Sequence, residues 1–192
     1  IQQRDLPMLD PSRRVLGIIR PTAETIGNLT ESRHIGVLAT EGTIKSQSYS
    51  MEIHKLFPDI HVSGVACPLW AAIVEAGEAD SPGADYFVKK RIDQLMRKDP
   101  LIDTIILGCT HYPLLMSSVV KNVPKGVRIM SQGTYVANSL ADYLKRHPEM
   151  ERNITQGGTC RYLTTESEQR FSETARIFLH EDVMVNHVDL TE

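Results

Sequence analysis

The sequence predicts an α/β domain in which a parallel β-sheet is flanked by helices. Short apolar segments typical of strands alternate with amphipathic segments typical of helices from residue 15 to about residue 122. The run Ile105–Leu107 is entirely apolar, as in a strand that is buried on both faces of a parallel sheet. Polar residues of interest follow these strands, at the carboxyl ends where open α/β sheets bind ligands.

The N-terminal part predicts one strand between helical segments. Residues 1–13 are polar and contain two prolines, so we interpret them as the end of a helix followed by a loop. The apolar run Val15–Ile19 is typical of a buried strand, and Arg20-Pro21 ends it. A helix is expected over residues 22–32.

The remaining elements follow from apolar periodicity and from Gly and Pro breaks. In the helix predicted over 134–146, Val136, Leu140 and Leu144 are expected to point inward. We expect strands at 35–39, 61–66, 102–107, 127–130 and 160–164, and helices at 44–56, 69–75, 84–98, 113–120, 134–146 and 168–179.

Composition excludes several classes of protein. Twenty-one Lys and Arg against 24 Asp and Glu give a net charge of -3, without the basic footprint of a nucleic-acid-binding protein. No apolar run approaches the length of a membrane span, and no signal peptide is visible. The three cysteines have no metal-site spacing, so reduced thiols in the cytoplasm are the simplest expectation.

The segment that follows the predicted strand 102–107 carries three reactive side chains in a row. Gly108 breaks the strand, Cys109, Thr110 and His111 follow, and Pro113 can open a helix. A free thiol has a pKa of about 8.5, so it is mostly protonated at neutral pH. A neighbouring imidazole can share or relay its proton, and amides at a following helix start can favour the thiolate. Because Cys109 and His111 are two residues apart, they can converge only in a turn. The alternative is a buried structural cysteine, which is how we interpret Cys67.

The stretch Leu107–Leu115 resembles the second cysteine signature of glutamate racemases. Aspartate racemases carry an acidic residue at the place of His111, so the histidine favours glutamate. The resemblance implies interconversion of L- and D-glutamate by two thiols on opposite faces of the α-carbon, with no metal and no other cofactor. It assigns Cys109 as one of the two thiols, His111 as its proton-relay partner and Thr110 as a substrate-binding residue.

Two further segments resemble parts of the same family. Thr40-Glu41-Gly42-Thr43 resembles its substrate loop, which implies that Thr40 and Thr43 bind glutamate. Helix capping is the alternative for both threonines. Val74-Glu75-Ala76-Gly77-Glu78 resembles a segment whose glutamate lies near the active histidine. Glu75 is therefore expected to orient His111, and a solvated carboxylate at a helix end is the alternative.

Two family motifs are absent, namely an Asp-Ser-Gly near the N-terminus and a Cys-Asn-Thr with the first catalytic cysteine. We therefore expect residues 1–20 to be a remnant of a first domain with a linker. Residues 21–130 are expected to form a second α/β domain, pseudo-symmetric to the first, that carries Cys109. Residues 131–192 are expected to return to the first domain. The chain by itself is expected to be incomplete and inactive, with exposed apolar surface in its tail.

The resemblance implies a bacterial, cytoplasmic isomerase that supplies D-glutamate for cell-wall peptidoglycan and forms a homodimer when complete. Two alternatives stay open. Cys109 could be the nucleophile of a hydrolase or acyl-transferase with His111 as its base. The chain could also be a non-catalytic remnant that binds a dicarboxylate.

Overall fold

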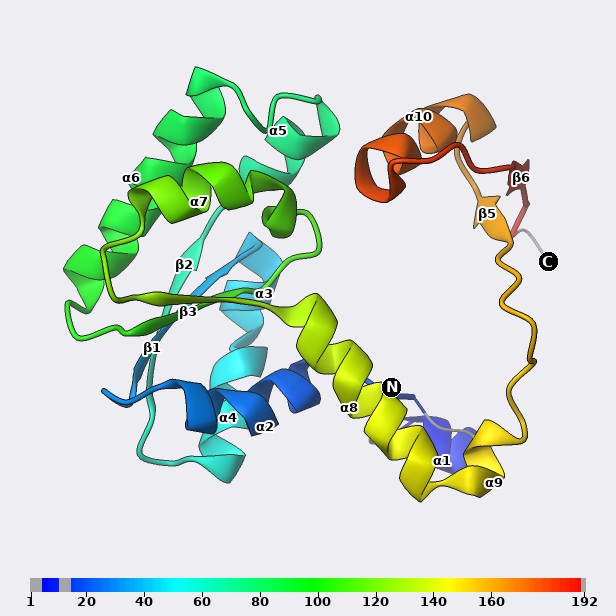
Figure 1. The fold of residues 1–192 in the computed structure, drawn as a ribbon, viewed down its shortest axis with the longest axis horizontal. Helices are drawn as coiled ribbons and strands as arrows, with labels where there is room; N and C mark the ends of the chain where they lie inside the picture. The colour runs from blue at the N-terminus through cyan, green and yellow to red at the C-terminus, as the bar shows by residue number, and fades with distance from the viewer. Residues whose placement is uncertain (1–4, 11–14, 191–192) are drawn as a thin grey trace.

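A four-stranded parallel sheet forms the centre of the structure, a computed structural model that describes residues 5–10 and 15–190 (Figure 1). The strand order is β2-β1-β3-β4. In register, Ile35 pairs with Val62 on one side and with Thr104 on the other. The predicted α/β class with a parallel sheet is confirmed. The strands are β1 (His34–Ala39), β2 (His61–Ala66), β3 (Thr104–Leu107) and β4 (Arg128–Ser131).

Helices cover both faces of this sheet, as Figure 1 shows. On one face, Leu38, Ile105 and Leu107 pack in a core with residues of α5 (Trp70–Glu75), α6 (Pro82–Lys98) and α7 (Met116–Asn122). On the other face, strand residues such as Val37 and Ile106 pack with α2 (Ile19–Leu29) and α4 (Ser48–Leu56). Burial on both faces explains why these strands are almost continuously apolar.

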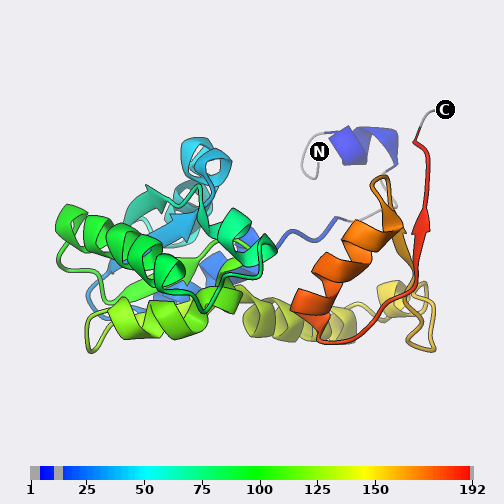
Figure 2. The ribbon, with the colours of Figure 1, turned by 90° about the horizontal axis from the view of Figure 1, so that it is seen from above.

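The segment after β4 extends away from the sheet, which is clearest in Figure 2. It ends in a small two-stranded parallel sheet with one helix. Strand β6 was not predicted, because its sequence is short and largely polar. The elements outside the central sheet and its main covering helices are α1 (Asp5–Leu9), α3 (Glu41–Ser46), the 3₁₀ helix η1 (Tyr112–Leu115), α8 (Gln132–Arg146), α9 (Pro148–Glu151), β5 (Tyr162–Thr164), α10 (Glu168–Leu179) and β6 (Val185–His187).

The strand predicted at Val15–Ile19 is wrong. Residues 15–17 have no regular structure, and α2 already begins at Ile19. Val15 and Leu16 are 44% and 51% exposed, and no strand within residues 5–10 and 15–190 pairs with this apolar run. Pro21 lies in the first turn of α2, where its missing N–H costs no hydrogen bond. The part of residues 1–13 that the structure describes includes α1, whereas residues 1–4 and 11–13 lie outside it.

Two predicted helices differ in detail. The helix expected over 44–56 is divided into α3 and α4, because Gln47 adopts a left-handed conformation with φ 53°. In α8, Leu140 is 43% exposed rather than inward, while Val136 and Leu144 are half-buried. Leu140 and Val136 line an open pocket of about 240 Å³ between α8 and the start of α2, so α2 covers this side of α8 only in part.

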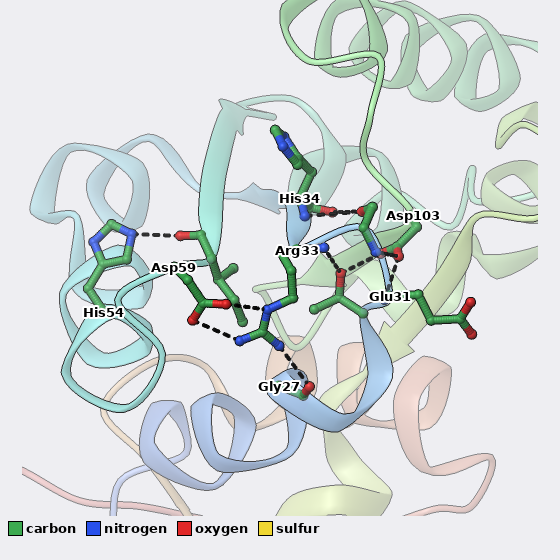
Figure 3. Close-up of polar contacts among 10 residues, drawn as sticks. Gly27, Glu31, Arg33, His34, His54, Asp59 and Asp103 are labelled. Carbon is green, nitrogen blue, oxygen red and sulfur yellow. Dashed lines mark hydrogen bonds and ion pairs between the residues drawn. The ribbon is translucent and has the colours of Figure 1, made fainter.

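The amino-terminal edge of the sheet is fixed by the carboxylate of Asp103, which precedes β3 (Figure 3). It accepts hydrogen bonds from the Thr30 hydroxyl at 2.7 Å and from the Glu31 and Ser32 amides at 2.7 and 2.6 Å. Burial raises the pKa of Asp103, but these hydrogen bonds outweigh it and bring the pKa to about 2. The charged carboxylate thereby ties the loop before β1 to β3.

Arg33 holds the same loop from the other side. Its guanidinium donates two hydrogen bonds to the Asp59 carboxylate, at 2.6 and 2.9 Å, and a third to the Gly27 carbonyl at 3.0 Å (Figure 3). Arg33 itself has a φ of 63°, a conformation that its three hydrogen bonds and its position over the Phe57 ring maintain. The starts of β1 and β2 are therefore joined at this edge.

Replacing Asp103 with Asn should lower the free energy of unfolding by about 2 kcal/mol at neutral pH. A charged acceptor of four hydrogen bonds is lost, the fourth being from the Thr104 hydroxyl at 2.9 Å. The depressed pKa stabilises the fold fully above the unfolded value of about 3.9 and loses this effect as the pH falls through about 2. Urea unfolding of both proteins across this range should show the difference shrinking below about pH 4.

Asp93→Asn is the matched control, since Asp93 forms an exposed ion pair with Lys89 on α6. It should change the free energy of unfolding by less than about 1 kcal/mol. An Asp103→Asn deficit that does not change with pH would contradict this account.

Candidate active site at the carboxyl end of the sheet

Three strand ends meet at the edge of the sheet opposite Asp103. The Gly108 amide donates to the Leu38 carbonyl at 2.8 Å, and the Cys67 amide donates to the Ala39 carbonyl at 2.8 Å. The residues that follow β1, β2 and β3 therefore lie side by side. Ligands bind at this edge in open parallel sheets.

Position 108 requires a glycine because neighbouring side chains leave little room for a Cβ atom there. A Cβ atom at this position would lie 3.1 Å from the Ala39 Cβ and 3.1 Å from Cε2 of the Tyr49 ring. Its φ is not positive, so the glycine permits close packing rather than an unusual backbone conformation. Beyond it, the chain turns over Cys109–His111, where the Tyr112 amide donates to the Cys109 carbonyl at 3.3 Å, and η1 begins.

The turn brings Cys109 and His111 together, and α5 adds Glu75. The Cys109 Sγ lies 3.8 Å from His111 Nδ1, and His111 Nε2 lies 2.9 Å from Glu75 Oε1. An ionised carboxylate only accepts hydrogen bonds, so Nε2 carries the hydrogen and Nδ1 is free to accept the thiol proton. This arrangement can convert the thiol to a thiolate and hold the resulting imidazolium against a carboxylate.

Thr110 lies beside the same ring nitrogen. Its hydroxyl is 3.5 Å from His111 Nδ1, and the residue is exposed. The Thr110 hydroxyl thus lies beside the nitrogen that can accept the proton of Cys109. Because Thr110 is exposed, this hydroxyl is available to a ligand that enters at this edge.

Thr40 follows β1 and caps α3. Its hydroxyl accepts a hydrogen bond from the Thr43 amide at 3.4 Å and lies 3.0 Å from the Thr43 hydroxyl. The capping alternative is therefore confirmed for Thr40, and Thr43 is its hydrogen-bond partner. Both residues are half-buried near the strand end.

Cys67, at the end of β2, differs sharply from Cys109. It is 1% exposed, and burial raises the pKa of its thiol to about 12. Its carbonyl accepts a hydrogen bond from the buried Tyr112 hydroxyl at 3.0 Å. Cys67 stays protonated and packed at neutral pH, in agreement with its interpretation as structural. All three cysteines are free.

A buried polar chain beneath the turn was not predicted. The Tyr49 hydroxyl donates to Gln132 Oε1 at 2.9 Å, and Gln132 Nε2 donates to the Thr22 hydroxyl at 2.7 Å. Burial raises the pKa of Tyr49, so its hydroxyl is neutral and serves as a donor. The chain joins α4, α8 and α2 under Gly108. The sequence offers no signal for it, since the partners are 83 and 110 residues apart.

The C-terminal segment also reaches this site. The ring of Phe178 on α10 meets the ring of His111 edge to face, with centroids 5.0 Å apart and an interplanar angle of 86°. Next to them is an apolar pocket of about 340 Å³, lined by His111, Tyr162, Phe171, Thr174, Ala175, Phe178 and Leu179.

Residues 5–10 and 15–190 contain no group of three or more His, Cys, Asp or Glu side chains placed to hold a metal ion. In the same ranges, none of the helices combines the length and the apolar character that crossing a bilayer requires.

Comparison with known proteins identifies the family. A family profile described as Asp/Glu/Hydantoin racemase matches residues 13–140, about two thirds of the chain. This chain belongs to that family. The family membership predicted from the Cys109 signature is confirmed.

Individual relatives of this racemase-family chain agree. It is 34% identical over 178 residues to glutamate racemase from Shouchella clausii, a match that covers 91% of this chain and 63% of the relative. The crystal structure of glutamate racemase isoform RacE1 from Bacillus anthracis matches with a TM-score of 0.83 and 33% identity, over 96% of this chain and 69% of that one.

A third match is the structure of glutamate racemase from Thermus thermophilus in complex with β-chloro-D-alanine. Its TM-score is 0.77 and its identity 27%, over 98% of this chain and 67% of that one. The chain spans less than two thirds of the length of the Shouchella clausii relative, namely 63%.

Gly108→Ala should destabilise the protein by about 1–3 kcal/mol, because the new methyl group would force Tyr49 and Ala39 apart. Gly133→Ala on α8 is the control, since its new methyl group meets nothing within 4 Å. Thermal unfolding should show a lower Tm for the first variant and an unchanged or slightly higher Tm for the second. Equal Tm values for the two variants would contradict the packing role of Gly108.

Proposed function

We propose that this chain is part of a glutamate racemase and carries one of its two proton-transferring thiols, Cys109. The observation that carries the proposal is the hydrogen-bonded series Cys109–His111–Glu75 at the carboxyl edge of the sheet. The relatives named as glutamate racemases support the choice of glutamate.

In the proposed mechanism, His111 Nδ1 takes the proton of Cys109, and Glu75 stabilises the imidazolium. The thiolate then removes the α-proton of glutamate, so that the C–H bond breaks and an S–H bond forms. A second thiol on the opposite face gives its proton to the α-carbon, which completes the inversion. In the reverse direction, Cys109 delivers the proton. No cofactor takes part in this proposal, since the acid and base are both thiols.

Substrate binding in this proposal uses Thr110, Thr40 and Thr43. Their hydroxyls can donate to a carboxylate of glutamate at the edge where Cys109 lies. Thr40 keeps its capping hydrogen bond with the Thr43 amide. The two hydroxyls share one hydrogen bond, so the hydroxyl that accepts in it has its own hydrogen available for a ligand. The exposed Thr110 is the most accessible of the three.

The second thiol has to come from elsewhere in the natural protein. Cys67 is buried and has a raised pKa, and Cys160 lies before β5 in the C-terminal segment. We propose a first domain with the second thiol, residues 1–20 as its remnant and linker, and residues 131–192 as the segment that returns to it. The domain with Cys109 is 21–130.

The proposal extends to the setting of the complete protein. We expect a bacterial, cytoplasmic homodimer that supplies D-glutamate for cell-wall peptidoglycan. Size-exclusion chromatography with light scattering of the natural full-length protein would test the dimer.

Cys109→Ser in the natural full-length protein should lower racemisation of both glutamate enantiomers by at least about 10³-fold, because a serine hydroxyl is too weakly acidic to replace the thiol. Circular dichroism of the amino acid follows the reaction directly. Cys160→Ser is the control and should keep normal activity. A normal rate for Cys109→Ser would exclude the site. A thioester trapped on Cys109 would favour the hydrolase or acyl-transferase alternative, and glutamate binding without inversion would favour the remnant.

Glu75→Gln should lower kcat by about 10- to 100-fold, because the glutamine amide can donate to Nε2 and favour the tautomer with hydrogen on Nδ1. That tautomer cannot accept the proton of Cys109. Glu78→Gln changes a nearby carboxylate that has no hydrogen bond to His111 in the described structure, and it should leave kcat unchanged. Steady-state kinetics in both directions provide the measurement, and an equal effect of the two variants would refute the role of Glu75.

A further inference from the structure

The imidazole of His111 has three polar neighbours and one aromatic neighbour. Glu75 accepts from Nε2, and the Cys109 thiol and the Thr110 hydroxyl lie next to Nδ1. The ring of Phe178 meets the imidazole edge to face. Aromatic rings prefer this geometry at centroid separations of about 4.5–7 Å, so the observed 5.0 Å is a true packing contact.

The three polar contacts are weak restraints by themselves. The contact between the exposed Thr110 hydroxyl and Nδ1 is 3.5 Å long. The Glu75 side chain is 52% exposed, and exposed ion pairs contribute little to holding a side chain in place. The Cys109–Nδ1 separation of 3.8 Å is long, and the thiol is a weak hydrogen-bond donor. Packing against Phe178 is therefore needed to fix the direction of the ring.

Phe178 belongs to a distant part of the chain. It lies near the end of α10, and both ribbon views show that end directed toward the α/β domain (Figures 1 and 2). Among the described residues after Met130, Phe178 is the one that packs against the core cluster of α5, α6 and α7. The contact with His111 thus joins the C-terminal segment to the site.

The pocket next to His111 and Phe178 is also formed between the α/β domain and the C-terminal segment. His111 is its one lining residue from the α/β domain, and the other six come from β5 and α10. The C-terminal segment therefore covers part of this side of the imidazole, and the His111 side chain is 23% exposed.

We propose that Phe178 is a positioning residue, which holds His111 Nδ1 toward Cys109 and shields the ring from water. The proposal rests on the proposed racemase function, in which His111 relays the proton of Cys109. It makes the C-terminal segment a working part of the site rather than only a structural extension.

Phe178→Ala in the natural full-length protein should lower kcat about tenfold and change KM by less than about twofold, since misplacing a catalytic group by about 1 Å can cost 10²-fold. Phe178→Tyr keeps the ring and should restore most of kcat. Phe171→Ala is the matched control, because it removes the same ring from the same helix face and pocket but from a residue with no ring contact to His111.

A second readout is independent of racemisation. Iodoacetamide reacts with thiolates, and peptide mass spectrometry follows the alkylation of Cys109 separately from that of every other thiol of the full-length protein. The ratio of alkylation rates at about pH 7 and about pH 9.5 cancels differences in access, because a thiol is largely ionised at the higher pH. This ratio should fall severalfold in Phe178→Ala and stay unchanged in Phe171→Ala.

The two readouts separate the two proposals. A wild-type protein without racemase activity but with the expected alkylation ratios would refute the racemase function and keep the positioning role. Normal kcat and normal alkylation ratio in Phe178→Ala would overturn the positioning role, as would an equal loss in Phe171→Ala.

Discussion

The close approach of Gly108 to Ala39 and to the Tyr49 ring is the constraint on which the site depends. It allows β3 to end directly against the end of β1, so that the turn Cys109–His111 starts at the carboxyl edge of the sheet. The Tyr49–Gln132–Thr22 hydrogen bonds hold the ring from beneath, and each partner is buried. A turn supported in this way keeps a thiol and an imidazole close although they are only two residues apart in sequence.

The amino-terminal and carboxyl ends of the strands differ in how their polar groups are used. At the amino-terminal edge, Asp103 and Arg33 are fully engaged in hydrogen bonds that fix the loops before β1 and β2. At the carboxyl edge, Cys109 is only half-buried and Thr110 is exposed, so polar groups stay available for a ligand. The stability of the domain is thus supplied away from the site, and the site is left open for chemistry.

The sequence was sufficient for the parts that depend on local pattern. Apolar runs located β1 to β4, and the Cys109–Thr110–His111 motif located the site. It was insufficient where distant contacts decide. Val15–Ile19 is as apolar as a strand, yet no strand of the described part of the chain pairs with it. The contacts of Tyr49 with Gln132 and of Phe178 with His111 join residues far apart in the chain, and the apolar periodicity of the sequence does not predict them. Glu75 was predicted as a site residue only because its segment resembles one of the family. The 2.9 Å distance between Glu75 Oε1 and His111 Nε2 agrees with the expected contact.

In the proposed mechanism, two thiols invert glutamate, and Cys109 is one of them. The reaction of the natural full-length protein can be run in D₂O and stopped at low conversion, and deuterium can then be measured at the α-carbon of the product enantiomer. Two thiols should give product that carries deuterium from solvent in both directions, because the proton delivered comes from a different group than the one that removes it. Product that retains the original α-hydrogen of the substrate would contradict a two-thiol mechanism, since a single base would then have moved the same proton from one face to the other.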